Sequence, residues 1–224
     1  MVKLAIYDMD RTITHAPTWA AFLISSAKGR VPWRLALLPL AGLASVAYAA
    51  KLLDRGRLKQ ISQRLILGAA LSQQRADEIA MRFADRVIDS GVFAGARAQI
   101  AADRGAGYRL VMATASYGFY AGAIAERLGF ETVIATGVAR DAQGRLLARI
   151  DGENCYGPAK LRMIEAWMAK QGIARADAHV RFYSDHVSDA PALAWADEAV
   201  AVNAHGPLRA LARAKGWAIE DWER

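Results

Sequence analysis

The sequence predicts a three-layer α/β fold in which helices cover both faces of a parallel sheet, with a helical insertion after the first strand. Short apolar segments recur at residues 3–7, 109–113, 132–136, 180–183 and 199–203. Helical patterns separate several of these segments, and strand and helix that alternate in this way are typical of a parallel sheet. Residues 17–90 have helical spacing and no convincing strand.

The first segment, KLAIY at residues 3–7, has the composition of a strand that is buried on both faces. Helices are expected at residues 119–128, ending at Gly129, and at residues 159–170, ending near Gly172. Residues 138–151 contain two short runs around Asp-Ala-Gln-Gly, which predicts a β-hairpin with a glycine in its turn.

Residues 31–53 of the insertion allow two interpretations. No charged residue occurs between Arg34 and Lys51, but a membrane-spanning helix needs about 20 apolar residues. Pro39 and Gly42 also interrupt the run. The segment is therefore expected to be either a buried helix or helical pair, or a segment that touches an anionic membrane surface through its apolar residues and basic flanks.

The composition limits which kinds of protein this chain can be. The 224 residues allow one core domain with a smaller insertion, and 54% hydrophobic residues are typical of a globular chain. The net charge of +7 favours anionic partners, but the basic residues are scattered, so no nucleic-acid binding is expected. One cysteine, Cys155, allows no internal disulfide, and no secretory signal is recognised. We expect a cytoplasmic protein that is peripheral to the inner membrane face if residues 31–53 bind lipid.

Two aspartates directly follow the first strand. Ligands of parallel α/β sheets bind beyond the carboxyl ends of the strands, which is where Asp8 and Asp10 are expected. Two carboxylates so close repel each other unless a cation or proton neutralises them, and Mg²⁺ prefers carboxylate oxygens. The pair therefore predicts a magnesium site.

Other polar residues are expected at the same edge of the sheet. Thr114 and Ala115 follow the second strand, where a hydroxyl and backbone N–H groups near a helix start can bind an anion. Lys160 lies at the start of a helix and supplies a positive charge. Asp185 and Asp189 follow a later strand and add two carboxylates.

The order of these motifs resembles the haloacid dehalogenase superfamily, subfamily IB, and most closely its phosphoserine phosphatase branch. YDMDRT, TASYGF, GPAK and SDHVSDAP are similar to the four motifs of that superfamily. The resemblance implies a Rossmann-like core formed by residues 1–15 and 91–224, and an α-helical cap formed by residues 16–90.

The resemblance also implies a role for each motif residue. Asp8 is the expected nucleophile, which forms an aspartyl-phosphate, and Asp10 the general acid and base. Thr114, Ala115 and Lys160 bind the phosphate. Mg²⁺ is held by the Asp8 side chain, the backbone carbonyl of Asp10 and Asp185, with Asp189 in support, and Thr12 orders the first loop.

The chain departs from that branch at one informative place. Phosphoserine phosphatases carry a glutamate shortly after the first motif, and here THAPTW contains no acid, which argues against phosphoserine as the substrate. Position 11 is arginine, where the family often has a small residue. Possible contacts of the cap and entrance with the substrate are Arg11, Arg57, Lys59, Arg64 and His186.

The sequence is compatible with three functions. The first is a Mg²⁺-dependent phosphomonoesterase, or phosphatase, that hydrolyses a small phosphorylated metabolite. The second is a phosphatase with the same chemistry whose substrate is a phospholipid of the phosphatidylglycerophosphate type at a membrane surface. The third is a catalytically silent binding or scaffold protein with the same fold.

Overall fold

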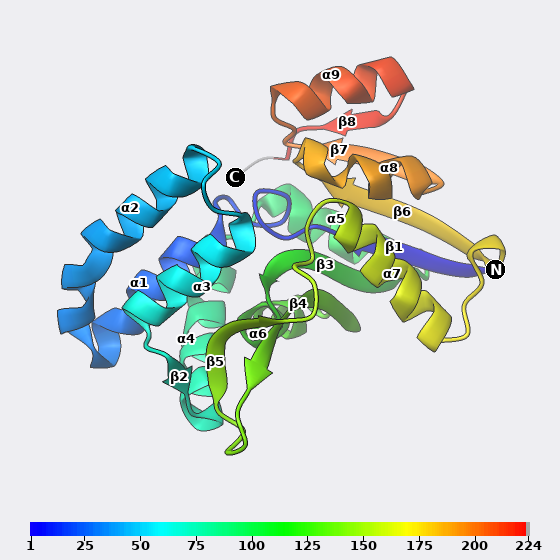
Figure 1. Ribbon diagram of the computed structural model, residues 1–224. Helices are drawn as coiled ribbons and strands as arrows, with labels where there is room; N and C mark the ends of the chain where they lie inside the picture. Colours follow the sequence, from blue (N-terminus) through cyan, green and yellow to red (C-terminus); the bar gives the residue numbers. More distant parts are fainter. Residues whose placement is uncertain (223–224) are drawn as a thin grey trace.

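The computed structural model describes residues 1–222 (Figure 1). Within this range the strands are β1 (Val2–Tyr7), β2 (Ala70–Leu71), β3 (Arg109–Tyr117), β4 (Thr132–Arg140), β5 (Leu146–Asp151), β6 (Ala178–Ser184), β7 (Glu198–Val202) and β8 (Ala218–Glu220). The α-helices are α1 (Thr18–Arg30), α2 (Leu38–Ala49), α3 (Arg55–Ile66), α4 (Gln73–Ser90), α5 (Ala94–Gly105), α6 (Gly118–Leu128), α7 (Pro158–Lys170), α8 (Ala190–Trp195) and α9 (Gly206–Lys215). Short 3₁₀ helices are η1 (Pro32–Leu37), η2 (Arg175–Asp177) and η3 (Val187–Asp189).

The strands of residues 1–222 form one sheet in the order β2-β5-β4-β3-β1-β6-β7-β8. All neighbours from β4 to β8 are parallel, and β5 pairs antiparallel with β4 and with β2. The central strand β1 lies between β3 and β6, with Tyr7 opposite Met112 and Tyr183. The carboxyl ends of these three strands, which precede the predicted motifs, therefore lie side by side.

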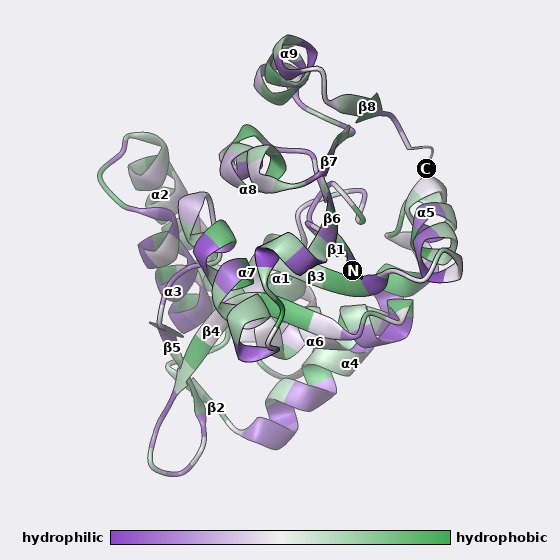
Figure 2. Cartoon of the chain, turned by 90° about the vertical axis from the view of Figure 1, so that its right-hand side faces the viewer, coloured by the Kyte–Doolittle hydropathy of each residue, from purple (hydrophilic) through white to green (hydrophobic). Residues whose placement is uncertain are grey.

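Helices cover both faces of the sheet, as the sequence predicted. Along β1, Ala5 and Tyr7 belong to one buried cluster with residues of α4, α5 and α6, whereas Leu4 and Ile6 belong to another with residues of α7, α8 and α9. Alternate residues of a strand point to opposite faces, so one apolar strand serves two cores. Figure 2 shows hydrophobic residues along β3 at the centre and hydrophilic residues on the peripheral helices α4 and α9.

Several boundaries differ from the predictions. β3 continues to Tyr117 with an irregular register after Thr114, so Thr114 lies within the strand and not beyond it. The predicted strand at residues 132–136 and the first arm of the hairpin form one strand, β4, because Gly137 between them stays in the sheet and pairs with Asp151 of β5. Ala70 and Leu71 form the short strand β2 in the segment expected to be wholly helical, where they extend the hairpin edge.

Helix ends follow local chemistry. α6 ends at Gly129, as predicted, with a φ of 75° that suits glycine. Pro39 does not interrupt a helix, because it lies in the first turn of α2, where a missing N–H breaks no hydrogen bond.

The helical insertion places α1, α2 and α3 together on one side of the molecule (Figure 1). The prediction of a buried helix at residues 31–53 is wrong, since Ala44 is the one buried residue of α2 and none of η1 is buried. The apolar run is divided between these two short elements. Within residues 1–222, no helix combines the length and apolar character needed to cross a bilayer.

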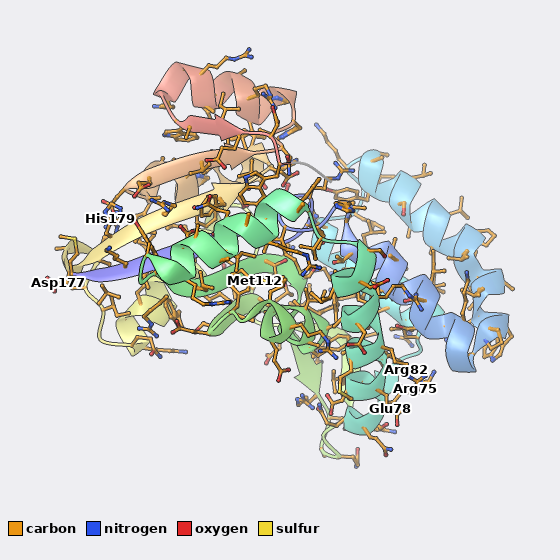
Figure 3. All side chains as sticks on the ribbon, turned by 180° about the vertical axis from the view of Figure 1, so that it is seen from behind. Arg75, Glu78, Arg82, Met112, Asp177 and His179 are labelled. Carbon is orange, nitrogen blue, oxygen red and sulfur yellow. The ribbon has the colours of Figure 1, made fainter. Side chains whose placement is uncertain are left out.

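The last helix of the insertion, α4, packs along α6 and thus against the sheet layers. On the side toward α1 it carries Arg75, Glu78 and Arg82 (Figure 3). These side chains line a pocket with Lys28 of α1.

Candidate active site

The loop after β1 presents two aspartates with different surroundings. Asp8 is 8% exposed, and its N–H donates to the Tyr183 carbonyl of β6 at 2.9 Å. Met9 points into the core and is fully buried, which anchors the loop between the two acids. Asp10 is partly exposed. The alternation of strand residues therefore continues past Tyr7, so that Asp8 and Asp10 lie on the polar side.

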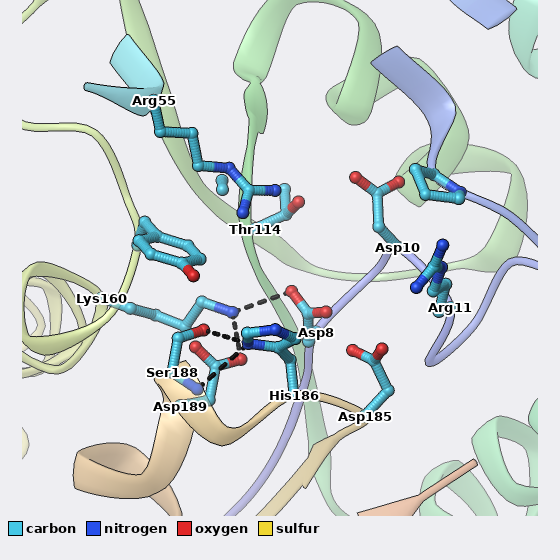
Figure 4. Close-up of a pocket in the computed structure, with 13 residues that line it drawn as sticks. Asp8, Asp10, Arg11, Arg55, Thr114, Lys160, Asp185, His186, Ser188 and Asp189 are labelled. Atoms are coloured by element: carbon cyan, nitrogen blue, oxygen red, sulfur yellow. Dashed lines mark hydrogen bonds and ion pairs between the residues drawn. The ribbon is translucent and has the colours of Figure 1, made fainter. Parts of the chain in front are cut away.

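Lys160 forms the central ion pairs of the site. Its Nζ lies 2.8 Å from Asp8 Oδ1 and 2.6 Å from Asp189 Oδ2 (Figure 4). It is 2% exposed, so the pairs are shielded from water. Burial lowers the pKa of Lys160, but Asp189 and Asp8 outweigh that effect and raise it above its ordinary value. Lys160 is therefore a fixed cation.

Burial raises the pKa of the Asp8 carboxyl to about 6, while the Lys160 ammonium opposes the shift and Asp189 adds to it. Asp185, which is 5% exposed, has a pKa raised to about 8 by burial and by the charges of Asp8 and Asp189. One ammonium thus faces three buried carboxyl groups. The site has an excess of negative charge.

Thr12 connects the two loops that carry Asp8 and Asp185. Its hydroxyl accepts a hydrogen bond from the Asp185 N–H at 3.0 Å and donates to Asp8 Oδ2 at 3.5 Å. Thr12 is fully buried. These two hydrogen bonds join the loop after β1 to the loop after β6.

Asp10 is held by residues of α1 and β3. Its Oδ1 accepts hydrogen bonds from the N–H and hydroxyl of Thr18, at 2.9 and 2.7 Å, and its Oδ2 accepts one from Ser116 at 3.3 Å. Tyr120 of α6 donates to Ser116 at 2.6 Å. A chain of hydroxyl groups therefore fixes the Asp10 carboxylate away from Asp8.

Thr114 and Ala115 lie at the irregular end of β3. Thr114 is 1% exposed, and its hydroxyl accepts a hydrogen bond from the Ser116 N–H at 3.1 Å. The Ala115 carbonyl accepts from the Lys59 ammonium and from the Thr136 hydroxyl, the latter at 2.8 Å. Lys59 also donates to Asn154 Oδ1 at 2.9 Å. These bonds orient the backbone at Ala115.

A pocket of about 220 Å³ brings the predicted core residues together. Its lining includes every predicted motif residue, which are Asp8, Asp10, Thr114, Ala115, Lys160, Asp185 and Asp189. Arg11 and His186 of the predicted entrance contacts also line it. The Arg11 backbone has a φ of 64°, unusual for a residue other than glycine, and its side chain is exposed.

The three predicted cap contacts lie elsewhere. Lys59 is buried, 6% exposed, at the junction of α3 with β3. Arg57 is exposed and lines a separate surface pocket with Asp54, and Arg64 is exposed on the same helix. None of the three lines the pocket around Asp8.

Comparison with known proteins decides the family. The model of the haloacid dehalogenase-like hydrolase family matches residues 5–194. The chain belongs to this family. Protein CicA of Caulobacter vibrioides is 32% identical over 197 residues, which cover 87% of this chain and 83% of that protein.

Other relatives match part of their length. Phosphoserine phosphatase SerB1 of Mycobacterium tuberculosis is 32% identical over 140 residues, or 62% of this chain and 44% of that protein. The chain thus spans less than half the length of that mycobacterial relative. Among solved structures, a protein of unknown function from Bordetella pertussis Tohama I has a TM-score of 0.88 at 24% identity and covers 99% of both chains. A substrate-bound phosphoserine phosphatase has a TM-score of 0.63 at 16% identity, covering 99% of this chain and 93% of that one. These structures show that the fold is shared.

The donor set of this family member fits a magnesium ion. No hydrogen bond to the Asp185 carboxylate occurs within residues 1–222, and Asp189 Oδ1 is buried there without a partner. No group of three or more histidine, cysteine or carboxylate side chains in the described chain is arranged to hold a metal. The expected magnesium ligands are two side chains, Asp8 and Asp185, and the backbone carbonyl of Asp10. This ligand set therefore does not require three metal-binding side chains. Oxygen donors with excess negative charge suit Mg²⁺.

Sequence reasoning missed several residues of the site. Arg55, the first residue of α3, extends toward Thr114 and lines the pocket with Tyr156 (Figure 4). Thr18 and Ser116 hold Asp10. Arg55 follows Asp54, which caps α3, and this capping signal marks the point where the helix starts. No sequence signal links Thr18 with Ser116, because they meet only in the folded chain.

Proposed function

We propose that this family member is a Mg²⁺-dependent phosphatase that acts on phosphomonoesters. One observation carries the proposal: Asp8, Lys160, Thr114 and Asp185 line one pocket, in which Asp8 is fixed by a buried ammonium at 2.8 Å. A buried carboxylate beside a fixed cation can approach a phosphate dianion that it would otherwise repel.

In this proposal Asp8 Oδ attacks phosphorus and forms an aspartyl-phosphate, while the P–O bond to the leaving group breaks. Asp10 protonates the leaving oxygen and then takes a proton from the water that hydrolyses the intermediate. Thr114, the Ala115 backbone and Lys160 bind the phosphoryl oxygens. Mg²⁺, held by the Asp8 side chain, the Asp10 carbonyl and Asp185, supplies positive charge that offsets the charge of the phosphoryl group. Asp189 orients Lys160.

The proposal also divides the chain into a core of residues 1–15 and 91–224 and a cap of residues 16–90. Residues 223 and 224 lie outside the described residues. The position of α1, α2 and α3 beside the pocket supports this division, since Arg55 and Pro17 reach the pocket from the insertion. A cytoplasmic location is part of the same proposal, because Cys155 is a free, buried thiol.

Turnover of p-nitrophenyl phosphate tests the proposed function. The wild type is expected to release nitrophenol with Mg²⁺ and to lose this activity when the metal is chelated. Asp8→Asn is expected to lower kcat by at least about a thousandfold, because the amide is not a nucleophile. Equal activity in Asp8→Asn would remove Asp8 as the nucleophile. A wild type without turnover would support the catalytically silent binding or scaffold protein instead.

A second candidate changes the substrate to a phospholipid at an anionic membrane surface. It is favoured by exposed apolar side chains on one part of the insertion, which are Trp33, Leu40, Leu43, Val46 and Leu52, with exposures from 49% to 78%. Lys51 lies beside them. Sedimentation with anionic and neutral vesicles tests this candidate: binding that Leu43→Glu weakens supports it, and a protein that never sediments with vesicles contradicts it.

A further inference from the structure

A second cavity, larger than the catalytic pocket, lies within the insertion. It measures about 540 Å³ and is formed by α1, α2 and α3. This volume is in the range of about 300–1,000 Å³ that ligand pockets usually have. The proposed phosphatase chemistry makes no use of it.

The wall of this cavity is mainly apolar. α1 contributes Trp19 and Leu23, α2 contributes Leu38 and Ala41, and α3 contributes Leu58 and Ile66. Apolar cavities are poor sites for water, because water needs polar partners. A small polar substrate such as a phosphorylated amino acid would leave such a space unfilled.

The cavity adjoins the catalytic pocket. Asp10, Pro17, Arg55 and Ala115 line both. Two of these shared residues, Asp10 and Arg55, are charged, whereas most of the remaining lining between the helices is apolar. A ligand that fills both has a charged end beside Asp8 and an apolar end in the cavity.

The packing of α2 gives independent support. A helix of a compact domain normally buries an apolar face, yet α2 buries Ala44 alone, although its twelve residues carry no charge. An added Cβ at Gly42, which lines the cavity, would meet no atom within 4 Å. At Gly42, α2 therefore faces space that no protein side chain fills.

We infer that the substrate is an amphiphilic phosphomonoester, whose phosphate binds at Asp8 and whose apolar chain lies in the cavity between α1, α2 and α3. This inference rests on the proposed phosphatase activity. Arg55 stands at the boundary, where its guanidinium, 4.4 Å from the centre of the Tyr156 ring, contacts the phosphate or its ester oxygen. The apolar chain accounts for the missing glutamate after the first motif, because such a substrate has no ammonium group to bind.

A series of n-alkyl phosphates of increasing chain length tests the inference. The leaving alcohols of this series have nearly the same chemistry, so a change in kcat/KM reports on binding of the chain. Below the concentration at which micelles form, kcat/KM is expected to rise about fourfold per added methylene until the cavity is filled. A wild type that hydrolyses p-nitrophenyl phosphate but shows no dependence on chain length overturns the inference and leaves the proposed function standing.

Two variants of α2 localise the effect. Gly42→Phe places a ring in the cavity and is expected to flatten the dependence on chain length. Ala49→Phe adds the same side chain to an exposed position of the same helix outside the cavity and is expected to keep it. If both variants behave alike, the chain binds elsewhere and the inference is wrong.

Binding to Asp8→Asn separates the inference from the proposed function. Alkylphosphonates cannot be hydrolysed, and calorimetry is expected to show affinity that rises with chain length. If this trend is found but wild type hydrolyses no phosphate ester, the chain site stands and the proposed function fails. A further experiment offers the wild type a two-chain phosphate monoester in neutral vesicles. Turnover in the vesicles indicates that the substrate is a bilayer lipid. Turnover of dispersed esters alone indicates that the substrate is a soluble amphiphile.

Discussion

At the scale of single residues, the site depends on how Asp8 and Asp10 are kept apart. Asp8 is paired with Lys160, and Asp10 is turned toward Thr18 and Ser116. Two carboxylates one residue apart in sequence thereby gain different environments. The proposed mechanism uses this difference, because it gives the two neighbouring acids separate nucleophilic and acid–base roles.

We predict that Thr18→Val lowers kcat for an alkyl phosphate by about tenfold and affects p-nitrophenyl phosphate much less. The variant keeps the shape of the side chain and removes the hydroxyl that holds Asp10 Oδ1 at 2.7 Å. Nitrophenol is a good leaving group that needs little protonation, so a misplaced acid matters mainly for alcohols. Steady-state kinetics on both substrates measure this, with Thr132→Val at the distant start of β4 as the control. Equal losses on both substrates would contradict the role of Asp10 as acid.

At the scale of elements, α3 joins the insertion to the end of β3. Lys59 is buried where its ammonium reaches the Ala115 carbonyl and Asn154, and its Nζ lies 4.8 Å from the centre of the Tyr117 ring. Burial, assisted by the charge of Arg55, lowers the pKa of Lys59 from 10.5 to about 7. Sequence reasoning placed Lys59 at the entrance, because a lysine on a polar helix face is usually exposed.

We predict that the free energy of unfolding of the wild type, relative to that of Lys59→Met, increases with pH. The unfolded chain binds a proton at Lys59 up to about pH 10 and the folded chain only up to about pH 7, so the penalty for burying the charge is fully present below pH 7. Between these values the free energy of unfolding of wild type relative to the variant should rise by up to about 1.4 kcal/mol per pH unit. Urea unfolding of both proteins across this range measures it, and a constant difference would sink the prediction.

At the scale of the whole molecule, one sheet separates two apolar cores, and the carboxyl ends of β1, β3 and β6 converge on the site. The parallel sheet, the hairpin and the end of α6 at Gly129 were predictable, because each depends on local residue patterns. The irregular end of β3 and the exposure of α2 were not, since both depend on contacts or spaces between distant segments. For the same reason, the sequence indicated the motif residues but not Arg55, Thr18 or the apolar cavity.

We predict that Phe182→Ala lowers the free energy of unfolding by about 3–5 kcal/mol. Phe182 is fully buried in the core beneath α7 and α8, and its loss leaves a cavity. Trp33→Ala removes a larger ring that is 64% exposed and should change stability by about 0.5 kcal/mol. Chemical denaturation compares the two, and similar losses would be inconsistent with a core on this face of the sheet.

Trapping the covalent intermediate tests the central claim most directly. After rapid quenching with acid, wild type mixed with a ³²P-labelled aryl phosphate should carry a label that hydroxylamine removes, as expected of an acyl phosphate. Asp10→Asn should accumulate more label, because attack on a good leaving group proceeds while activation of water is lost. Asp8→Asn should carry none. Label that persists in Asp8→Asn, or activity in wild type without any labelled intermediate, would contradict the assignment of Asp8 as the nucleophile.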